Sequence, residues 1–71
     1  MEKYVVYTQI HENGTIQNWY YGTYNSKDRA NEVAEELGGK WPVYHCVCTK
    51  SEAMKDGIEN LPLDWKKDID K

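Results

Sequence analysis

The first half of the chain alternates apolar and polar positions in the manner of a β-hairpin. Residues 3–10 and 16–24 are rich in Val, Ile, Tyr and Trp, the side chains that favour extended structure. Between these two runs lies Asn13-Gly14, and this dipeptide is the strongest short-range signal for a hairpin turn because both residues tolerate positive φ. The pattern therefore predicts two antiparallel strands joined by a tight turn.

The pairing register of this hairpin depends on the type of its turn. A two-residue type I′ turn would pair Ile10 with Gln17. A type I turn followed by a left-handed Gly14 would instead pair Ile10 with Ile16, and we favour it because its cross-strand side chains match better. The favoured register puts one apolar set on each face of the hairpin: Tyr4, Val6, Ile10, Ile16 and Tyr20 on one, and Val5, Tyr7, Trp19 and Tyr21 on the other.

A helix is predicted over residues 26–37, where apolar side chains recur at the spacing of a single helix face. Asn25 or Ser26 can cap its first turn, and Gly38-Gly39 is a typical helix end. The small side chains in the apolar stripe allow close approach to a sheet. The stripe consists of Ala30, Val33, Ala34 and Leu37.

A third strand is predicted over residues 41–49, and Pro42 near its start is typical of an edge strand. Placing this strand beside the first one gives a three-stranded antiparallel sheet in the order 2-1-3, with the helix packed on one face. Further along, Ser51 can cap one or two helical turns that end at Gly57.

These elements predict a single α+β domain over residues 1–71, with a ββαβ core at 3–49 and a partly helical tail at 50–71. A chain of 71 residues suits one domain and not two. No apolar run approaches the roughly 18 residues of a membrane span. The opening Met1-Glu2 leads directly into a strand pattern, without a signal peptide. We therefore expect a cytoplasmic protein with reduced cysteines.

Charge and aromatic content narrow the function. The chain carries nine basic and twelve acidic residues, and Arg29 is its only Arg. Duplex nucleic acid is held by clustered Lys and Arg, so the net charge of −3 disfavours that role. The aromatic residues are six Tyr and three Trp, with no Phe. Tyr and Trp have polar tips and are enriched at binding hot spots, so this set indicates a recognition surface.

The residues that could carry chemistry do not form a familiar site. Cys46 and Cys48 point to one face of a strand, which leaves His45 on the other face, and a structural zinc site needs four ligands. Neither His11 nor His45 has a predicted nucleophile within reach, and no glycine-rich phosphate loop is present. We expect no metal, no cofactor and no enzymatic activity.

The face of the sheet opposite the helix can be covered in two ways. If the tail folds over it, Leu61, Leu63 and Trp65 complete a second core. If the tail does not, the apolar face needs a protein partner or a second copy of the chain to cover it.

The segment Gly22–Leu37 joins a strand that ends in an aromatic residue to a Ser26-capped helix with alanines facing the sheet. This arrangement resembles small ββαβ proteins of bacteriophages and low-GC Gram-positive bacteria, a likeness that extends over residues 3–49. The resemblance implies an accessory protein that acts by binding, for example a phage-encoded modulator or inhibitor of a host or defence protein. It implies no particular site residue.

Taken together, the residues predict a non-enzymatic protein-binding domain that acts through an aromatic sheet face. One alternative is a single-stranded nucleic-acid binder that stacks bases on the rings, although the chain lacks a basic groove. A second alternative is a structural homodimer. The side chains that we expect to anchor a protein partner are Tyr7, Trp19, Tyr21, Trp41 and Trp65.

Overall fold

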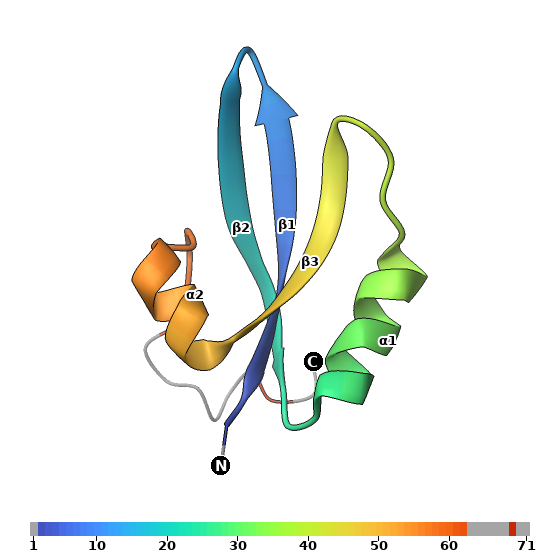
Figure 1. Cartoon of the computed structure of the whole chain (residues 1–71), viewed down its shortest axis with the longest axis vertical. Helices are drawn as coiled ribbons and strands as arrows, with labels where there is room; N and C mark the ends of the chain where they lie inside the picture. Colours follow the sequence, from blue (N-terminus) through green and yellow to red (C-terminus); the bar gives the residue numbers. More distant parts are fainter. Residues whose placement is uncertain (1, 63–68, 70–71) are drawn as a thin grey trace.

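The computed structural model of this chain describes residues 2–62 and 69, and Figure 1 shows how its elements are arranged. The elements follow the order β1 (Tyr4–Glu12), β2 (Thr15–Tyr24), α1 (Lys27–Leu37), β3 (Val43–Thr49) and α2 (Lys50–Asp56). The strands form one antiparallel sheet in the order β2-β1-β3. The predicted α+β class, strand order and packed helix are thus confirmed.

The hairpin between β1 and β2 closes through a two-residue turn. Asn13 and Gly14 both have positive φ, at 49° and 78°. Ile10 consequently pairs with Gln17, so the favoured register, with a left-handed bulge at Gly14, was wrong. The physical reason is that two left-handed turn residues match the twist of the strands, and Asn-Gly adopts this conformation at little cost.

A second irregularity lies further down the hairpin. Val6 pairs with Gly22 whereas Tyr7 pairs with Tyr20, which leaves Tyr21 as an extra residue on β2. Such a bulge lets β2 change which side chains face each side of the sheet.

The two-residue turn corrects the predicted faces of the β2 residues up to Tyr20, and the bulge at Tyr21 shifts the register of the residues beyond it. Tyr20 pairs with Tyr7 and shares its face, instead of the face of Val6. Trp19 pairs with Thr8, which places it on the same side of the sheet as Val6 and α1.

The core beneath α1 follows the predicted stripe. Ser26 caps the helix, because its hydroxyl accepts a hydrogen bond from the backbone N–H of Arg29 at 3.1 Å. Ala30 and Val33 then face the sheet, where small side chains allow a close approach. The buried members of this core are Val6, Tyr24, Ala30 and Val33, and Tyr4, Ala34 and Val47 pack around them.

A second core lies on the opposite face of the sheet, where α2 packs (Figure 1). Val5, Ala53 and Ile58 are buried there, and Leu61 also contacts this core. The face opposite α1 is therefore covered at this end by residues that follow β3. Leu63 and Trp65, which were also expected to contribute, lie outside the described residues.

The cap of α2 differs from the expected one. Thr49, not Ser51, precedes the helix: the Glu52 backbone N–H donates to the Thr49 hydroxyl at 3.1 Å, and the Thr49 N–H donates to the Glu52 carboxylate at 3.1 Å. These two hydrogen bonds form a capping box. The Thr49 backbone N–H, followed by the Thr49 side chain, holds the pKa of the Glu52 carboxyl below its usual value.

We predict that Thr49→Ala lowers the free energy of unfolding by about 1 kcal/mol, because it removes the hydroxyl that caps α2. Urea denaturation measures this change. Ser51→Ala is the matched control, since Ser51 is exposed and lies inside the same helix. Its effect should stay within about 0.5 kcal/mol. Equal losses in the two variants would contradict the assigned cap.

Candidate functional site

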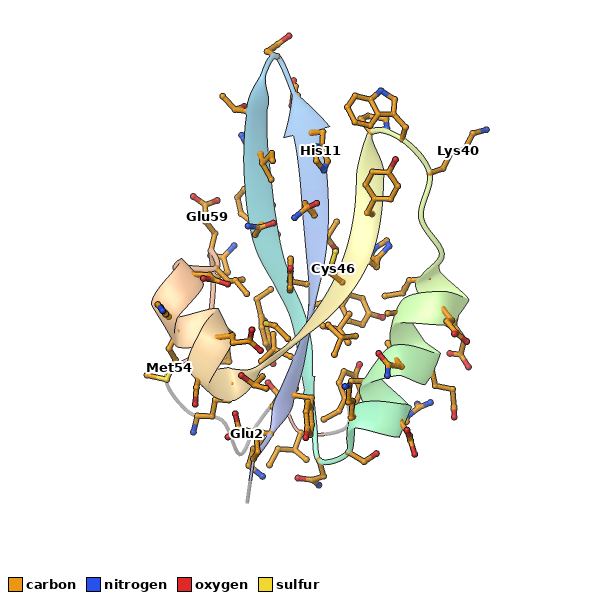
Figure 2. The ribbon with its side chains drawn as sticks, viewed as in Figure 1. Glu2, His11, Lys40, Cys46, Met54 and Glu59 are labelled. Atoms are coloured by element: carbon orange, nitrogen blue, oxygen red, sulfur yellow. The ribbon has the colours of Figure 1, made fainter. Side chains whose placement is uncertain are left out.

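Four side chains from three segments meet at the end of the sheet that lies away from α2. We call this group the aromatic corner, and Figure 2 labels one of its members, His11. The rings of His11 and Trp41 lie 5.2 Å apart between centroids, and those of His11 and Tyr44 lie 5.6 Å apart, edge to face. Trp41 and Tyr44 are 6.4 Å apart. Ile16, the Cα partner of His11 on β2, completes the corner.

A short turn holds Trp41 beside the end of β1. Lys40 and Val43 exchange two backbone hydrogen bonds, each of 2.7 Å, and the Trp41–Pro42 peptide bond is cis. The His11 N–H then donates to the Pro42 carbonyl at 2.8 Å, which ties the turn to β1. The position of Trp41 is therefore set by backbone contacts and not only by ring packing.

A hydrogen bond to Gln9 on the same strand orients the His11 ring, and Gln9 is in turn held by Asn18 on β2. His11 Nε2 lies 2.8 Å from Gln9 Oε1, and Gln9 Nε2 donates to Asn18 Oδ1 at 3.2 Å. Because an amide oxygen can only accept, the neutral His11 ring carries its proton on Nε2 and leaves Nδ1 as an acceptor. The corner therefore combines aromatic surface with oriented polar groups.

The corner is exposed and has a concave side. Trp41 keeps 68% of its surface exposed and Ile16 keeps 58%. A cavity of about 230 Å³ lies between them, lined by His11, Ile16, Trp41 and residues 12–15 of the turn. The exposed apolar side chains and the hollow beside them can together receive a side chain from another molecule.

The structure does not bring the five predicted anchors together. Trp41 belongs to the corner. Trp19 and Tyr21 lie on β2, at 37% and 39% exposure, and the Trp19 indole N–H donates to Gln17 at 3.2 Å. Tyr7 packs in the second core beside α2, where burial and neighbouring Cys46 raise its pKa to about 12. Trp65 lies outside the described residues.

Sequence reasoning did not select His11 and Tyr44 as binding residues. The sequence places both near strand ends, because His11 is the last residue but one of β1 and Tyr44 is the second residue of β3. Only the β1–β3 pairing, with Gln9 opposite Tyr44, brings them to the same end of one face.

The two cysteines, Cys46 and Cys48, are free thiols. Burial, followed by the nearby negative charges of Glu52 and Asp56, raises the pKa of the Cys48 thiol to about 11. Among the described residues, no group of three His, Cys, Asp or Glu side chains is arranged to hold a metal ion.

Comparison with known proteins finds no matching family model, no curated protein and no solved structure that resembles this chain. The resemblance to small ββαβ phage proteins therefore stays a prediction. Within the part of the chain that the structure describes, no helix is both long and apolar enough to cross a bilayer.

We predict that Cys48 reacts slowly with a thiol reagent in the native state. A pKa of about 11 leaves roughly one thiol in a thousand ionised at pH 8, and the thiolate is the reactive form. In a Cys46→Ser variant, where Cys48 is the only thiol, the reaction should be at least about tenfold slower before than after denaturation in urea. Equal rates in the two states would contradict the raised pKa.

Proposed function

We propose that this chain is a non-enzymatic protein-binding domain that contacts its partner through the aromatic corner. The observation that carries the proposal is Trp41, whose large side chain is mostly exposed and yet held in place by His11, Tyr44 and the Lys40–Val43 turn. Exposed Trp and Tyr side chains supported in this way are typical of binding hot spots.

Covering Trp41 with a partner would release enough free energy to make a substantial contribution to binding. An aromatic side chain buries about 150–250 Å² when covered, at about 25 cal/mol per Å². With 68% of Trp41 exposed, covering it contributes roughly 2–4 kcal/mol. That range matches the contribution of a single hot-spot residue.

The corner also needs little reordering before it binds. The Lys40–Val43 turn is closed by its own hydrogen bonds, and the His11 ring is oriented through Gln9. Fewer side chains must therefore lose conformational freedom on association, which favours affinity.

Charge supports a protein over a nucleic acid as the partner. The chain has a net charge of −3, and no Lys or Arg among the described residues lines the cavity beside Trp41. A polyanion would have to approach an acidic molecule without phosphate contacts. The setting that we propose is the one implied by the resemblance, an accessory protein that modulates or inhibits a host or defence protein.

We predict that Trp41→Ala weakens partner binding by about 2 kcal/mol or more while leaving the fold intact, because it removes the exposed ring from the corner. Quantitative mass spectrometry of proteins captured from a lysate of the source organism measures the effect. Met54→Ala is the matched control, since Met54 on α2 is also exposed, at 60%.

The supporting result is a protein captured by the unmodified chain and by Met54→Ala but lost with Trp41→Ala. Equal capture by all three chains would overturn the role of the corner. Sedimentation over a concentration series shows whether the partner is a second copy. Quenching of Trp fluorescence by a short single-stranded oligonucleotide at low salt would favour the nucleic-acid alternative.

A further inference from the structure

The outer edge of β3 presents unpaired backbone groups. His11 N–H bonds to the Pro42 carbonyl and Lys50 N–H bonds to the Lys3 carbonyl, each at 2.8 Å. In an antiparallel pair the backbone groups of alternate residues point toward the partner strand. The even-numbered residues of β3 therefore face β1, and the backbone groups of His45 and Val47 point away from the sheet.

This open stretch of edge is bounded on both sides by the chain itself. At one end, Val43 also points outward, but both its backbone groups bond to Lys40 at 2.7 Å. At the other end, the Thr49 N–H donates to Glu52 in the capping box. Among the described residues, no hydrogen bond engages the N–H or C=O groups of His45 and Val47. The edge thus offers a short and defined window for another strand.

The opposite edge of the sheet, strand β2, is paired with other backbone segments. On β2, the Tyr20 N–H donates to the Glu59 carbonyl and the Glu59 N–H donates to the Asn18 carbonyl, each at 3.0 Å. Ile69 forms a further backbone bridge with Thr23 on the same strand. The segments that follow α2 therefore pair with β2, and β3 is the edge with the open window.

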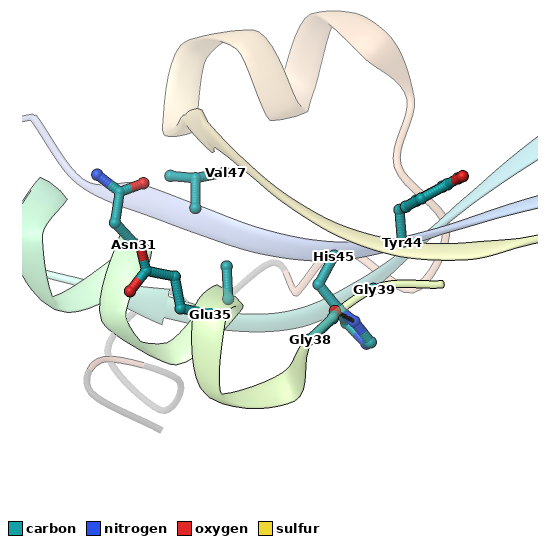
Figure 3. Close-up of a pocket in the computed structure, with 8 residues that line it drawn as sticks. Asn31, Glu35, Gly38, Gly39, Tyr44, His45 and Val47 are labelled. Atoms are coloured by element: carbon teal, nitrogen blue, oxygen red, sulfur yellow. Dashed lines mark hydrogen bonds between the residues drawn. The ribbon is translucent and has the colours of Figure 1, made fainter. Parts of the chain in front are cut away.

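The window opens into a groove between β3 and α1, shown in Figure 3. The groove has a volume of about 530 Å³, room for several side chains. Ala34 and Val47 supply apolar surface, whereas Asn31 and Glu35 form a polar wall on the helix. Gly38 and Gly39 lie at its end, next to His45 (Figure 3).

One hydrogen bond fixes the geometry of this groove. His45 Nδ1 lies 2.7 Å from the Gly38 carbonyl, and a carbonyl only accepts, so the ring donates from Nδ1. The bond ties the C-terminal end of α1 to the open part of β3. The helix and the strand edge are therefore held at a set separation before any ligand arrives.

The negative charge along the α1 wall of the groove favours a ligand that carries positive charge. Helix α1 carries two basic and four acidic residues, and Arg29 already pairs with Glu32 at 2.9 Å. Glu35, in contrast, has no ion-pair partner among the described residues. The C-terminal end of a helix also carries partial negative charge, and the last turn of α1 holds no basic residue. A ligand with a cationic side chain therefore complements the negative charge of this wall of the groove.

We propose that the groove binds an extended segment of a partner protein, which adds to β3 as a fourth strand and places a Lys or Arg against Glu35. Such strand addition obtains affinity from backbone hydrogen bonds and specificity from alternate side chains. Pairing at His45 and Val47 would form about four backbone hydrogen bonds. The two ligand residues opposite His45 and Val47 point toward α1, so one should be basic and the other apolar.

A second copy of this chain fits the groove less well than a single strand. Figure 1 shows α1 flanking β3, so pairing two β3 edges would bring the α1 of each copy beside the other. Each α1 has two more acidic than basic residues, and like charges at close range repel. An extended basic segment carries no such helix, and the electrostatics favour it.

The first test uses a displayed library of random heptapeptides, selected on the full chain and then synthesised with a fluorescent label. We expect enriched peptides with a basic and an apolar residue two positions apart. Glu35→Lys should reduce their affinity by about tenfold, since it replaces attraction with repulsion. Glu36→Lys is the matched control, because it makes the same charge change one residue away and outside the groove. It should reduce affinity by less than about threefold.

A second measurement identifies strand addition. Methylation of the peptide N–H groups that face β3 should reduce affinity by about tenfold, whereas methylation of the alternate N–H groups should leave it unchanged. Hydrogen exchange followed by NMR should show slower exchange at the His45 and Val47 amides once the peptide is bound.

The proposal is overturned if the selection enriches no peptide, if Glu35→Lys and Glu36→Lys behave alike, or if both methylation patterns have the same effect. Trp41→Ala separates this site from the aromatic corner. Peptides in the groove should bind the Trp41 variant normally, and capture through the corner should survive Glu35→Lys. Each proposal can therefore fail without the other.

Discussion

The central strand β1 must bury side chains on both of its faces, and the rest of the fold follows from this constraint. Val5 and Val6 are neighbours in the sequence, point to opposite sides and are both fully buried. The face of Val6 packs under α1, and the face of Val5 packs under α2 and Ile58. The described residues provide two short helices for this purpose, α1 and α2, and both pack toward the same end of the sheet.

The other end of the sheet has to be stabilised without a covering helix. There β1 places Gln9 and His11 on the face that α2 covers further down, and a hydrogen bond and ring contacts with Trp41 and Tyr44 replace a buried core. The two edges of the sheet differ in the same way: the backbone of Glu59 pairs with β2, whereas no described residue pairs with the outer edge of β3 at His45 and Val47. Both proposed sites lie where no segment among residues 2–62 and 69 covers the sheet.

The sequence predicted the elements that depend on short-range signals. Asn13-Gly14 predicted the hairpin, and the spacing of Ala30 and Val33 predicted the helix and its buried face. Ser26 was one of two expected caps and is the one used. The strand order 2-1-3 also followed, since the helix must return the chain to the open side of β1. The turn, the helix and its cap rest on interactions between residues a few positions apart.

Tertiary structure decided the features that depend on the pairing register of the strands. The turn type exchanged the faces of Tyr20 and Trp19, because a shift of one residue inverts every following side chain, and the extra residue Tyr21 shifts the register again for the residues beyond it. The candidate site depends on the same kind of contact. His11 and Trp41 are far apart in the chain and meet only when the backbone of β1 hydrogen-bonds the turn before β3. Local sequence signals predict the elements themselves, whereas the side chains that these elements bring together are determined by long-range pairing.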